Sequence, residues 1–298
     1  MSPMVALRLG RVSNLPTVWA NTLAGAVLAG AGVPGTFIAP DARMLAACMV
    51  AMSAFYIGGM FLNDAFDHEI DARERPERPI PSGAVSARTV FLAGFTLLGA
   101  GVVLLGLGAA WTATPRPGAT IFSASTLCAA IVYYDSRHKD DPMAPMVMAL
   151  CRSLIYVTTS FAISGIASEA ALGAAAASFC YTAGLTYVAS RENLSEIGNL
   201  WPVAVLGLPV IYGLPWALAG IRESIVAVSL LSAWIGYSLS FAVRAHGRSV
   251  PGAVVRLIAG MALLDAMLLA GNGFDTAAMA AAAMLPLTRM FQRFVPGT

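Results

Sequence analysis

Three aspartates at the end of an apolar segment have a spacing suited to binding a divalent cation. The segment from Asn63 to Asp71 reads NDAFDHEID. If a helix continues through it, spacings of three and four residues place Asp64, Asp67 and Asp71 on one face, beside Asn63. Crowded carboxylates stay ionised only when a cation lies between them, and Mg²⁺ prefers oxygen ligands. Because Mg²⁺ usually binds one or two carboxylates together with substrate phosphate, the pattern predicts a metal and a phosphate-bearing ligand.

An arginine-rich loop follows these acids directly. Residues 73–83 read RERPERPIPSG, and the arginines Arg73, Arg75 and Arg78 lie within a short distance of one another in the chain. Arginine binds phosphate oxygens through two parallel hydrogen bonds, and the prolines are expected to end the helix and stiffen the loop. Charged loops also serve simply as anchors at membrane edges. The order of acids followed by arginines favours a binding site over an anchor.

The elements that must position these residues are membrane helices. The 298 residues are 58% hydrophobic and only 11% charged, against about 25% charged residues in a typical soluble domain. The apolar runs lack the alternation of strands, and backbone groups within lipid must bond internally, so the chain is expected to be an all-α bundle and a single domain over residues 1–298. The expected spans are 15–33, 42–62, 88–110, 119–134, 143–165, 168–189, 200–220, 223–243, 252–271 and 275–292, of which 119–134 and 275–292 are short, giving nine or ten helices.

The distribution of basic residues predicts the orientation. With the N-terminus in the cytoplasm, most of the 18 Lys and Arg fall on the cytoplasmic side, and only Arg43, Arg116 and Arg222 fall on the other. This bias follows the positive-inside rule and places the N-terminus and the acidic loops in the cytoplasm. The net charge of +2 is too small to indicate nucleic-acid binding. The four cysteines and three histidines show no metal-ligand spacing.

The motif at Asn63–Gly83 resembles the first signature of the UbiA superfamily of intramembrane prenyltransferases, with special similarity to its chlorophyll-synthase-like and EboC-like branches. The resemblance implies about nine transmembrane helices around a central cavity with a cytoplasmic cap. It implies Mg²⁺-dependent transfer of a prenyl group from an allylic prenyl diphosphate donor to an aromatic or other small lipophilic acceptor among membrane lipids. By match, Asn63, Asp64, Asp67 and Asp71 bind Mg²⁺ and the diphosphate, the three aspartates are catalytic, and Arg78 lies near the diphosphate.

Two further loops correspond to the family less closely. Where the family has a second Asp-x-x-x-Asp signature, this chain has Glu192 and Glu196, whose spacing would allow them to bind a second Mg²⁺ or simply to be solvated. The loop that begins YYDSRHK at Tyr133 offers Tyr134 and Lys139 as diphosphate contacts, with Arg137 in the role of Lys139 as the alternative. The same loop also fits a simple positive-inside anchor.

Polar residues inside the apolar segments complete the candidate set. A charge within a membrane helix is costly and by default indicates function, so Arg152 is expected to face the cavity and bind substrate unless it reaches the interface. Asp265 is similarly placed, with no partner evident from the sequence. Asn21 is a further substrate-binding candidate, although a lone membrane asparagine more often bonds to a neighbouring helix.

Two alternatives to prenyl transfer remain at the level of sequence. The altered second signature is compatible with a UbiA-like protein that lacks ordinary transferase activity and binds, or helps to export, an isoprenoid or other lipophilic precursor. A transporter using Arg152 and Asp265 is disfavoured, because the acids gather at one face and not at the midplane of the membrane.

Overall fold

The protein is an all-helical bundle. The computed structural model describes residues 1–30, 39–139, 141–189, 201–243 and 250–295, and this part of the chain contains helices and no strand. The elements are α1 Pro3–Leu9, the 3-10 helix η1 Val12–Asn14, α2 Leu15–Ala29, α3 Ala42–Phe66, α4 His68–Glu74, α5 Ala87–Trp111, α6 Pro117–Arg137, α7 Ala144–Ser164, α8 Glu169–Ala189, α9 Trp201–Leu218, α10 Arg222–Val243, α11 Val250–Gly271 and α12 Asp275–Phe291.

Each of the ten expected spans corresponds to one helix of this bundle, which confirms the predicted fold class. In the described part of the chain, eight helices are long and apolar enough to cross a membrane. The other two, α2 with 15 residues and α12 with 17, are shorter. The expectation of a short span at 119–134 was wrong, because α6 begins at Pro117 and continues to Arg137, giving 21 residues. Proline is favoured in the first turn of a helix because its missing N–H has no partner there.

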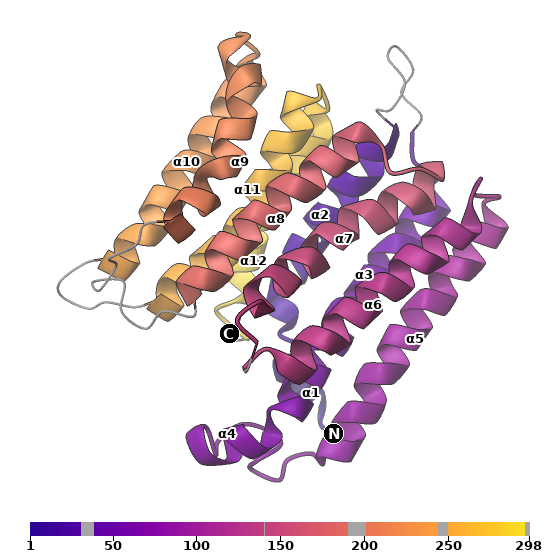
Figure 1. Ribbon diagram of the computed structural model, residues 1–298, viewed down its shortest axis with the longest axis vertical. Coiled ribbons are helices and arrows are strands. Elements are labelled where there is room, and N and C mark those ends of the chain that lie inside the picture. Colours follow the sequence, from indigo (N-terminus) through magenta and orange to yellow (C-terminus); the bar gives the residue numbers. More distant parts are fainter. Residues whose placement is uncertain (31–38, 140, 190–200, 244–249, 296–298) are drawn as a thin grey trace.

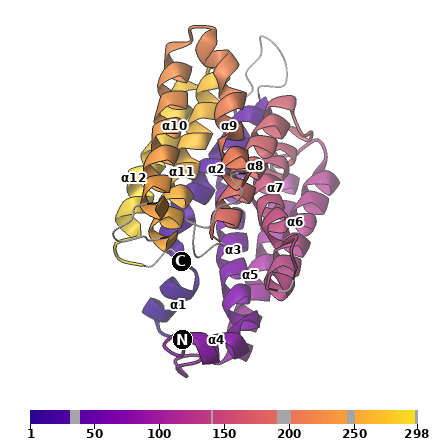
Figure 2. The ribbon, with the colours of Figure 1, turned by 60° about the vertical axis from the view of Figure 1, so that its left-hand side comes forward.

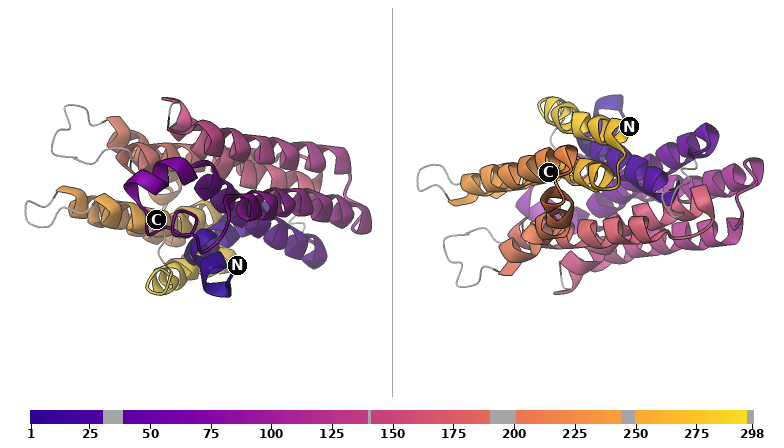
Figure 3. Two further views of the ribbon diagram at one scale, coloured as in Figure 1. Left: turned by 90° about the horizontal axis from the view of Figure 1, so that it is seen from below. Right: turned by 90° about the horizontal axis from the view of Figure 1, so that it is seen from above.

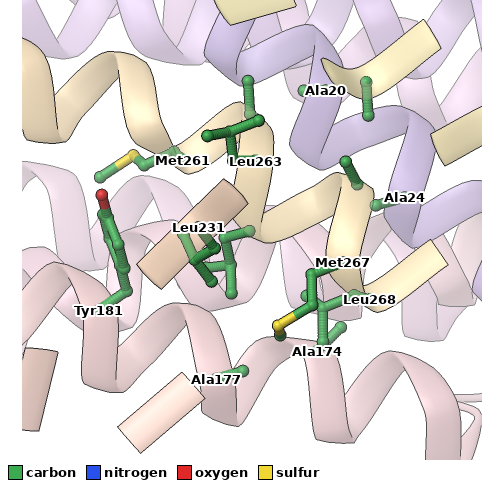
Figure 4. Packing of buried hydrophobic residues seen from close by; sticks show 14 of the residues in the cluster. Ala20, Ala24, Ala174, Ala177, Tyr181, Leu231, Met261, Leu263, Met267 and Leu268 are labelled. Carbon is green, nitrogen blue, oxygen red and sulfur yellow. The ribbon is translucent and has the colours of Figure 1, made fainter. Parts of the chain in front are cut away.

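The long helices lie side by side with their axes roughly aligned, as the views from below and from above show (Figure 3). Neighbours in the chain pack mostly on each other, as α3 does on α5 and α7 on α8. Helix α2 also packs on helices far from it in the chain, since it contacts α7, α8, α11 and α12 as well as α3 (Figure 1). It therefore joins α3 and α7, in the first half of the bundle, to α8, α11 and α12, in the second half. Its residues Ala20 and Ala24 are buried against α11 in the largest apolar cluster (Figure 4). Such small residues let membrane helices approach closely.

The acid-bearing segment bends where the sequence predicted a continuous helix. Helix α3 ends at Phe66 and α4 begins at His68, with Asp67 between them in a helix-like conformation (φ −79°, ψ −3°). The Asp67 N–H still bonds to the Asn63 carbonyl at 3.0 Å, and the Asp71 N–H bonds to the Asp67 carbonyl at 2.8 Å. The backbone path is therefore nearly helical through the bend. Helices α1 and α4 lie below the ends of the long helices, where they form a cap (Figure 2).

Helices α8 and α9 approach each other at a glycine. A Cβ atom added at Gly184 would lie 2.7–2.8 Å from the N, Cα and Cβ atoms of Leu206, two of which belong to the backbone. Backbone atoms cannot rotate away as a flexible side chain can. The absence of a side chain at Gly184 is therefore what sets the separation of the two helices.

We expect Gly184→Ala to destabilise the protein by about 1–3 kcal/mol, the usual cost of overpacking, because α8 and α9 must move apart. Thermal unfolding of the detergent-solubilised protein measures this. Gly207→Ala, on α9, is the matched control, since a Cβ there meets no atom within 4 Å. Equal melting temperatures for the two variants would contradict the close approach.

Candidate functional site

Two of the predicted aspartates share one arginine. Arg78 Nη1 lies 2.6 Å from Asp71 Oδ2 and 3.4 Å from Asp64 Oδ1. Arg11, which precedes η1, approaches the same Asp64 oxygen at 3.2 Å. Both carboxylates are buried, with 7% of Asp64 and 3% of Asp71 exposed. Arg78 thus places one positive charge beside both buried acids, and the prolines that follow α4 turn the Arg78 loop back toward them.

The third aspartate faces the other side of the cluster. Asp67 Oδ2 lies 3.4 Å from His138 Nε2 and 3.6 Å from Lys139 Nζ, both just beyond α6. Burial raises the pKa of Asp67, but the hydrogen bonds and positive charge supplied by His138 and Lys139 outweigh it, so the pKa lies below its ordinary value. The structure thus brings Lys139, and not Arg137, to the acids. Arg137 is exposed and forms no ion pair with another described residue.

Asn63 connects the cluster to a fourth carboxyl group. Its Nδ2 donates to Asp135 Oδ1 at 3.3 Å, across the contact between α3 and α6. Asp135 is 3% exposed and lies in the last turn of α6, next to Tyr134. The Tyr134 ring stacks on His138, with centroids 5.1 Å apart. Asn63 and Tyr134 therefore line the same end of the bundle as the three aspartates.

A cavity of about 100 Å³ begins beneath this end and extends into the bundle between α3, α6 and α7. Its lining is mostly apolar, with polar groups confined to a few residues. Tyr134 and Asp135 belong to α6, whereas Tyr56 and Met52 lie eight and twelve residues before Asp64 on α3. At 1.5 Å per helical residue these positions are about 12 and 18 Å below Asp64. The cavity therefore leads from the charged end into an apolar interior.

Arg152 lines this cavity and is held by polar groups on α2. Its Nη1 donates to Asn21 Oδ1 at 2.8 Å and its Nη2 to Thr17 Oγ1 at 3.2 Å. The Asn21 amide nitrogen donates in turn to Asp265 Oδ2 at 2.7 Å and to the Tyr156 hydroxyl at 3.0 Å. The Tyr156 hydroxyl completes the network by donating to Asp265.

This network supplies the partner for Asp265 that the sequence did not reveal. Asn21, Tyr156 and Asp265 are all fully buried. Among Asn21, Arg152, Tyr156 and Asp265, only Arg152 lines the cavity. Its positive charge is balanced by the carboxylate of Asp265, because Asn21 forms hydrogen bonds with both side chains. The predicted interhelical role of Asn21 and the predicted cavity-facing position of Arg152 therefore occur together.

The remaining predicted metal ligands, Glu192 and Glu196, lie outside the described residues. Among the described residues, no three His, Cys, Asp or Glu side chains form a preassembled metal cage. The donor chemistry nevertheless fits Mg²⁺. Asp64 and Asp71 already place two hard oxygens around one cationic nitrogen of Arg78, and a site of one or two carboxylates is what Mg²⁺ normally uses with phosphate. Ligation by Asn63 and by all three aspartates stays a prediction.

Three contributors to the site were not singled out from the sequence as site residues. They are Arg11, Asp135 and His138. Asp135 had a signal, because it is an acid within the last turn of an otherwise apolar helix. Arg11 and His138 had none, since their contacts depend on how η1 and α6 pack against α3.

Comparison with known proteins places this geometry in context. The model of the UbiA prenyltransferase family matches residues 18–294. A digeranylgeranylglyceryl phosphate synthase from Methanopyrus kandleri is 31% identical over 232 residues, covering 76% of each chain. One from Metallosphaera sedula is 46% identical over 70 residues, and the chain spans about a quarter of that relative (24%). A chloroplastic chlorophyll synthase from Oryza sativa subsp. japonica is 39% identical over 97 residues, covering 32% of this chain and 25% of the relative.

Solved structures share the fold. One described as digeranylgeranylglyceryl phosphate synthase in membranes superimposes with a TM-score of 0.61 at 16% identity, covering 91% of this chain and 97% of the other. The apo structure of a UbiA homolog from Aeropyrum pernix K1 gives a TM-score of 0.50 at 14% identity, covering 95% and 97%. At these identities the likeness concerns the fold alone.

We expect Asp265→Ala to destabilise the protein by about 3–5 kcal/mol, because it leaves Arg152, inside the bundle, without its balancing charge. The melting temperature in detergent measures the loss. Asp275→Ala is the matched control, since Asp275 is exposed in the first turn of α12. If both variants melt with the wild type, the network has no structural role.

Proposed function

The chain belongs to the UbiA prenyltransferase family, and from that premise we propose that it transfers a prenyl group from an allylic prenyl diphosphate to a lipophilic acceptor within the membrane. It is an integral membrane protein of that family, with several helices able to span the bilayer. One observation carries the proposal: a buried cluster of aspartates and cations stands directly above a mostly apolar cavity. An amphiphilic donor with a charged head and an isoprenoid tail matches that arrangement.

The diphosphate head would bind at the charged end. Mg²⁺, when bound by the aspartates, would neutralise charge that develops on the leaving diphosphate. The side chains of the site would bind the metal and the phosphate oxygens. Asp64 and Asp71 present their oxygens from either side of Arg78, while Asp67 holds His138 and Lys139 on the opposite side. Arg78 and Lys139 can turn from their carboxylate partners to phosphate oxygens, the anions that both side chains bind well.

The cavity would hold the reacting carbon and the tail. When the bond between the first prenyl carbon and the diphosphate oxygen breaks, its electron pair leaves with the diphosphate and an allylic cation remains. The acceptor bonds to that carbon and loses a proton. The apolar walls contributed by Met52, Phe55, Leu127 and Ile155 exclude water, which would otherwise capture the cation. Arg152, held in place by Asn21 and Thr17, offers the acceptor a fixed polar contact at the cavity wall.

We propose that the charged end faces the cytoplasm. Asp64 lies in the last turn of α3, and Asp67, Asp71 and Arg78 lie in the connection to α5, which also carries Arg73 and Arg75. The connection at the opposite end of α5, which leads to α6, carries only Arg116. Excess Lys and Arg marks the cytoplasmic side, where soluble Mg²⁺ and the diphosphate head of the donor are available.

We expect Asp67→Asn to reduce diphosphate release from an allylic donor by roughly 10²-fold or more, the usual effect of removing one group that stabilises transition-state charge. The measurement is diphosphate release by the purified protein in detergent, with a panel of lipophilic acceptors and Mg²⁺. Excess chelator should abolish release from the wild type, and added Mg²⁺ should restore it.

Glu69→Gln is the matched control, because Glu69 is an exposed acid two residues away. It should retain wild-type activity within about twofold. Release that persists in chelator, or that is unaffected by Asp67→Asn while the protein remains folded, would refute the proposed metal-diphosphate site.

The orientation is tested with single cysteines in a background whose four native cysteines are replaced by alanine. Ser82→Cys lies in the loop after α4, and Gly118→Cys lies at the start of α6, at the other end of the bundle; both positions are exposed. We expect a membrane-impermeant maleimide to label Gly118→Cys in intact cells and Ser82→Cys only after permeabilisation. The reverse pattern would invert the topology.

A further inference from the structure

Three arginines gather where α11 begins and α12 ends. Arg256 lies near the start of α11, Arg289 lies in the last turn of α12, and Arg293 follows that helix. Arg289 is close enough to Arg256 and Arg293 for the positive charges of both to act on it. None of the three forms an ion pair with another residue of the described ranges. We refer to these three residues as the basic cluster.

The described acids of α10, α11 and α12 lie too far away to neutralise the basic cluster. Glu223 and Asp275 occupy the first turns of α10 and α12, at the opposite end of the bundle. Asp265 lies nine residues after Arg256 on α11, about 14 Å along the helix axis, and is bound to Asn21. Within the described structure, the charge of the basic cluster is therefore uncompensated, unlike that of the cations beside the three aspartates.

Uncharged groups hold two of these arginines in place. The guanidinium carbon of Arg256 lies 3.6 Å from the centroid of the Phe241 ring, and its Nη1 donates to the Gly252 carbonyl at 2.7 Å. The Nη1 of Arg289 donates to Gln292 Oε1 at 2.7 Å. A guanidinium group has five N–H donors, so both arginines keep donors that can bind an anion.

The helices that carry the basic cluster are joined to each other at its level. Gln292 Nε2 donates to the carbonyl of Val255, which precedes Arg256, at 3.3 Å. The same nitrogen donates to Asn14 Oδ1 at 2.9 Å, so the basic cluster lies at the end of the bundle that also holds η1 and the aspartates. None of its three arginines is among the described residues that line the cavity between α3, α6 and α7. The basic cluster is therefore separate from the proposed reaction site.

Exposed apolar side chains lie beside the basic cluster. Met290 is 46% exposed and Phe294 is 76% exposed, each next in sequence to one of the arginines. On α10, which packs on α11 (Figure 2), Tyr237 is 48% exposed, and Leu230 and Val226 continue the same helix face at similar exposure. Cations beside apolar surface at the end of membrane helices lie at the level of the lipid head groups. A ligand that fits this place carries an anionic group and an apolar chain.

We propose that the basic cluster binds the phosphate of an anionic phospholipid, whose acyl chains lie along the exposed apolar faces of α10 and α12. Guanidinium groups bind phosphate oxygens through paired hydrogen bonds, and basic pockets between membrane helices bind anionic head groups. A zwitterionic lipid fits less well, because its ammonium group adds a positive charge next to three uncompensated arginines. The inference goes beyond the proposed function and does not depend on it, because the basic cluster lies outside the cavity.

Native mass spectrometry of the full chain in detergent tests this with phosphatidylglycerol and phosphatidylcholine that carry identical acyl chains. We expect the first phosphatidylglycerol to bind about tenfold more tightly than phosphatidylcholine. Arg256→Gln and Arg289→Gln should each weaken phosphatidylglycerol binding about fivefold, which corresponds to about 1 kcal/mol for one arginine near an anionic head group, and leave phosphatidylcholine binding unchanged. Arg222→Gln is the matched control, since Arg222 is exposed at the opposite end of α10, and it should behave as the wild type.

Glycerol phosphate in large excess separates a lipid site from a site for phosphate alone. It should leave phosphatidylglycerol bound, and displacement would overturn the lipid assignment. Equal affinities of the wild type for the two lipids, or unchanged phosphatidylglycerol binding in both variants, would also overturn it. Melting temperatures in detergent show whether the variants are folded. If Arg256→Gln and Arg289→Gln do not fold, Arg293→Gln, at an exposed position beyond α12, takes their place in the same comparison.

Discussion

The arrangement of the charged end follows from one constraint: carboxylates gathered at the edge of an apolar bundle stay ionised only if cations accompany them. Asp64 and Asp71 share Arg78, Asp64 also takes Arg11, and Asp67 takes His138 and Lys139. These cations come from the residue before η1, from the loop after α4 and from the segment after α6. Charge compensation therefore draws three separate parts of the chain to the end of α3, and the cap is built in the process. In a site assembled in this way, the negative charges of the aspartates are compensated before substrate binds. When a metal-bound diphosphate binds, the aspartates would pair with the metal and the cations with the phosphate, so no charge would be left without a partner.

The same constraint acts inside the bundle with a different solution. Arg152 lies on α7 and Asp265 on α11, both inside the bundle. Asn21 on α2 forms hydrogen bonds with both of them, and Tyr156 forms a further hydrogen bond with Asp265. An amide is suited to this position, because its oxygen accepts from the guanidinium while its nitrogen donates to the carboxylate. Helix α2 thus connects the two halves of the bundle through apolar packing at Ala20 and Ala24 and through a polar contact at Asn21. Polar contacts of this kind fix which helix faces meet, a choice that packing of similar apolar surfaces alone leaves open.

Most of the fold was predictable from the sequence, because spanning segments are defined by length and apolarity, and each expected span corresponds to a helix. The limits lay where chain geometry depends on tertiary contact. The bend at Asp67, which separates α3 from α4, contains no proline or glycine that would predict it from the sequence. The acids of the first motif were predictable from their spacing, and the approach of Lys139 to Asp67 was one of two alternatives. Arg11 and His138 were not predictable as site residues, since a cation at a membrane edge has the same sequence signal whether it anchors a helix or balances an acid.

Polarity changes with depth along the cavity, and this order limits how two substrates can share it. Charged groups lie at the cap, Asp135 and Tyr134 lie beneath them, Tyr56 and Arg152 lie deeper, and Met52 and Phe55 continue the apolar wall. A donor whose diphosphate occupies the cap must direct its first carbon toward Asp135. An acceptor can reach that carbon only by placing its nucleophilic group at the same level of the cavity. Arg152 is the charged side chain that an acceptor meets deeper in the cavity. Arg152 is fixed by Asn21 and Thr17, so an acceptor with a polar group at that depth gains a contact that a purely apolar one does not.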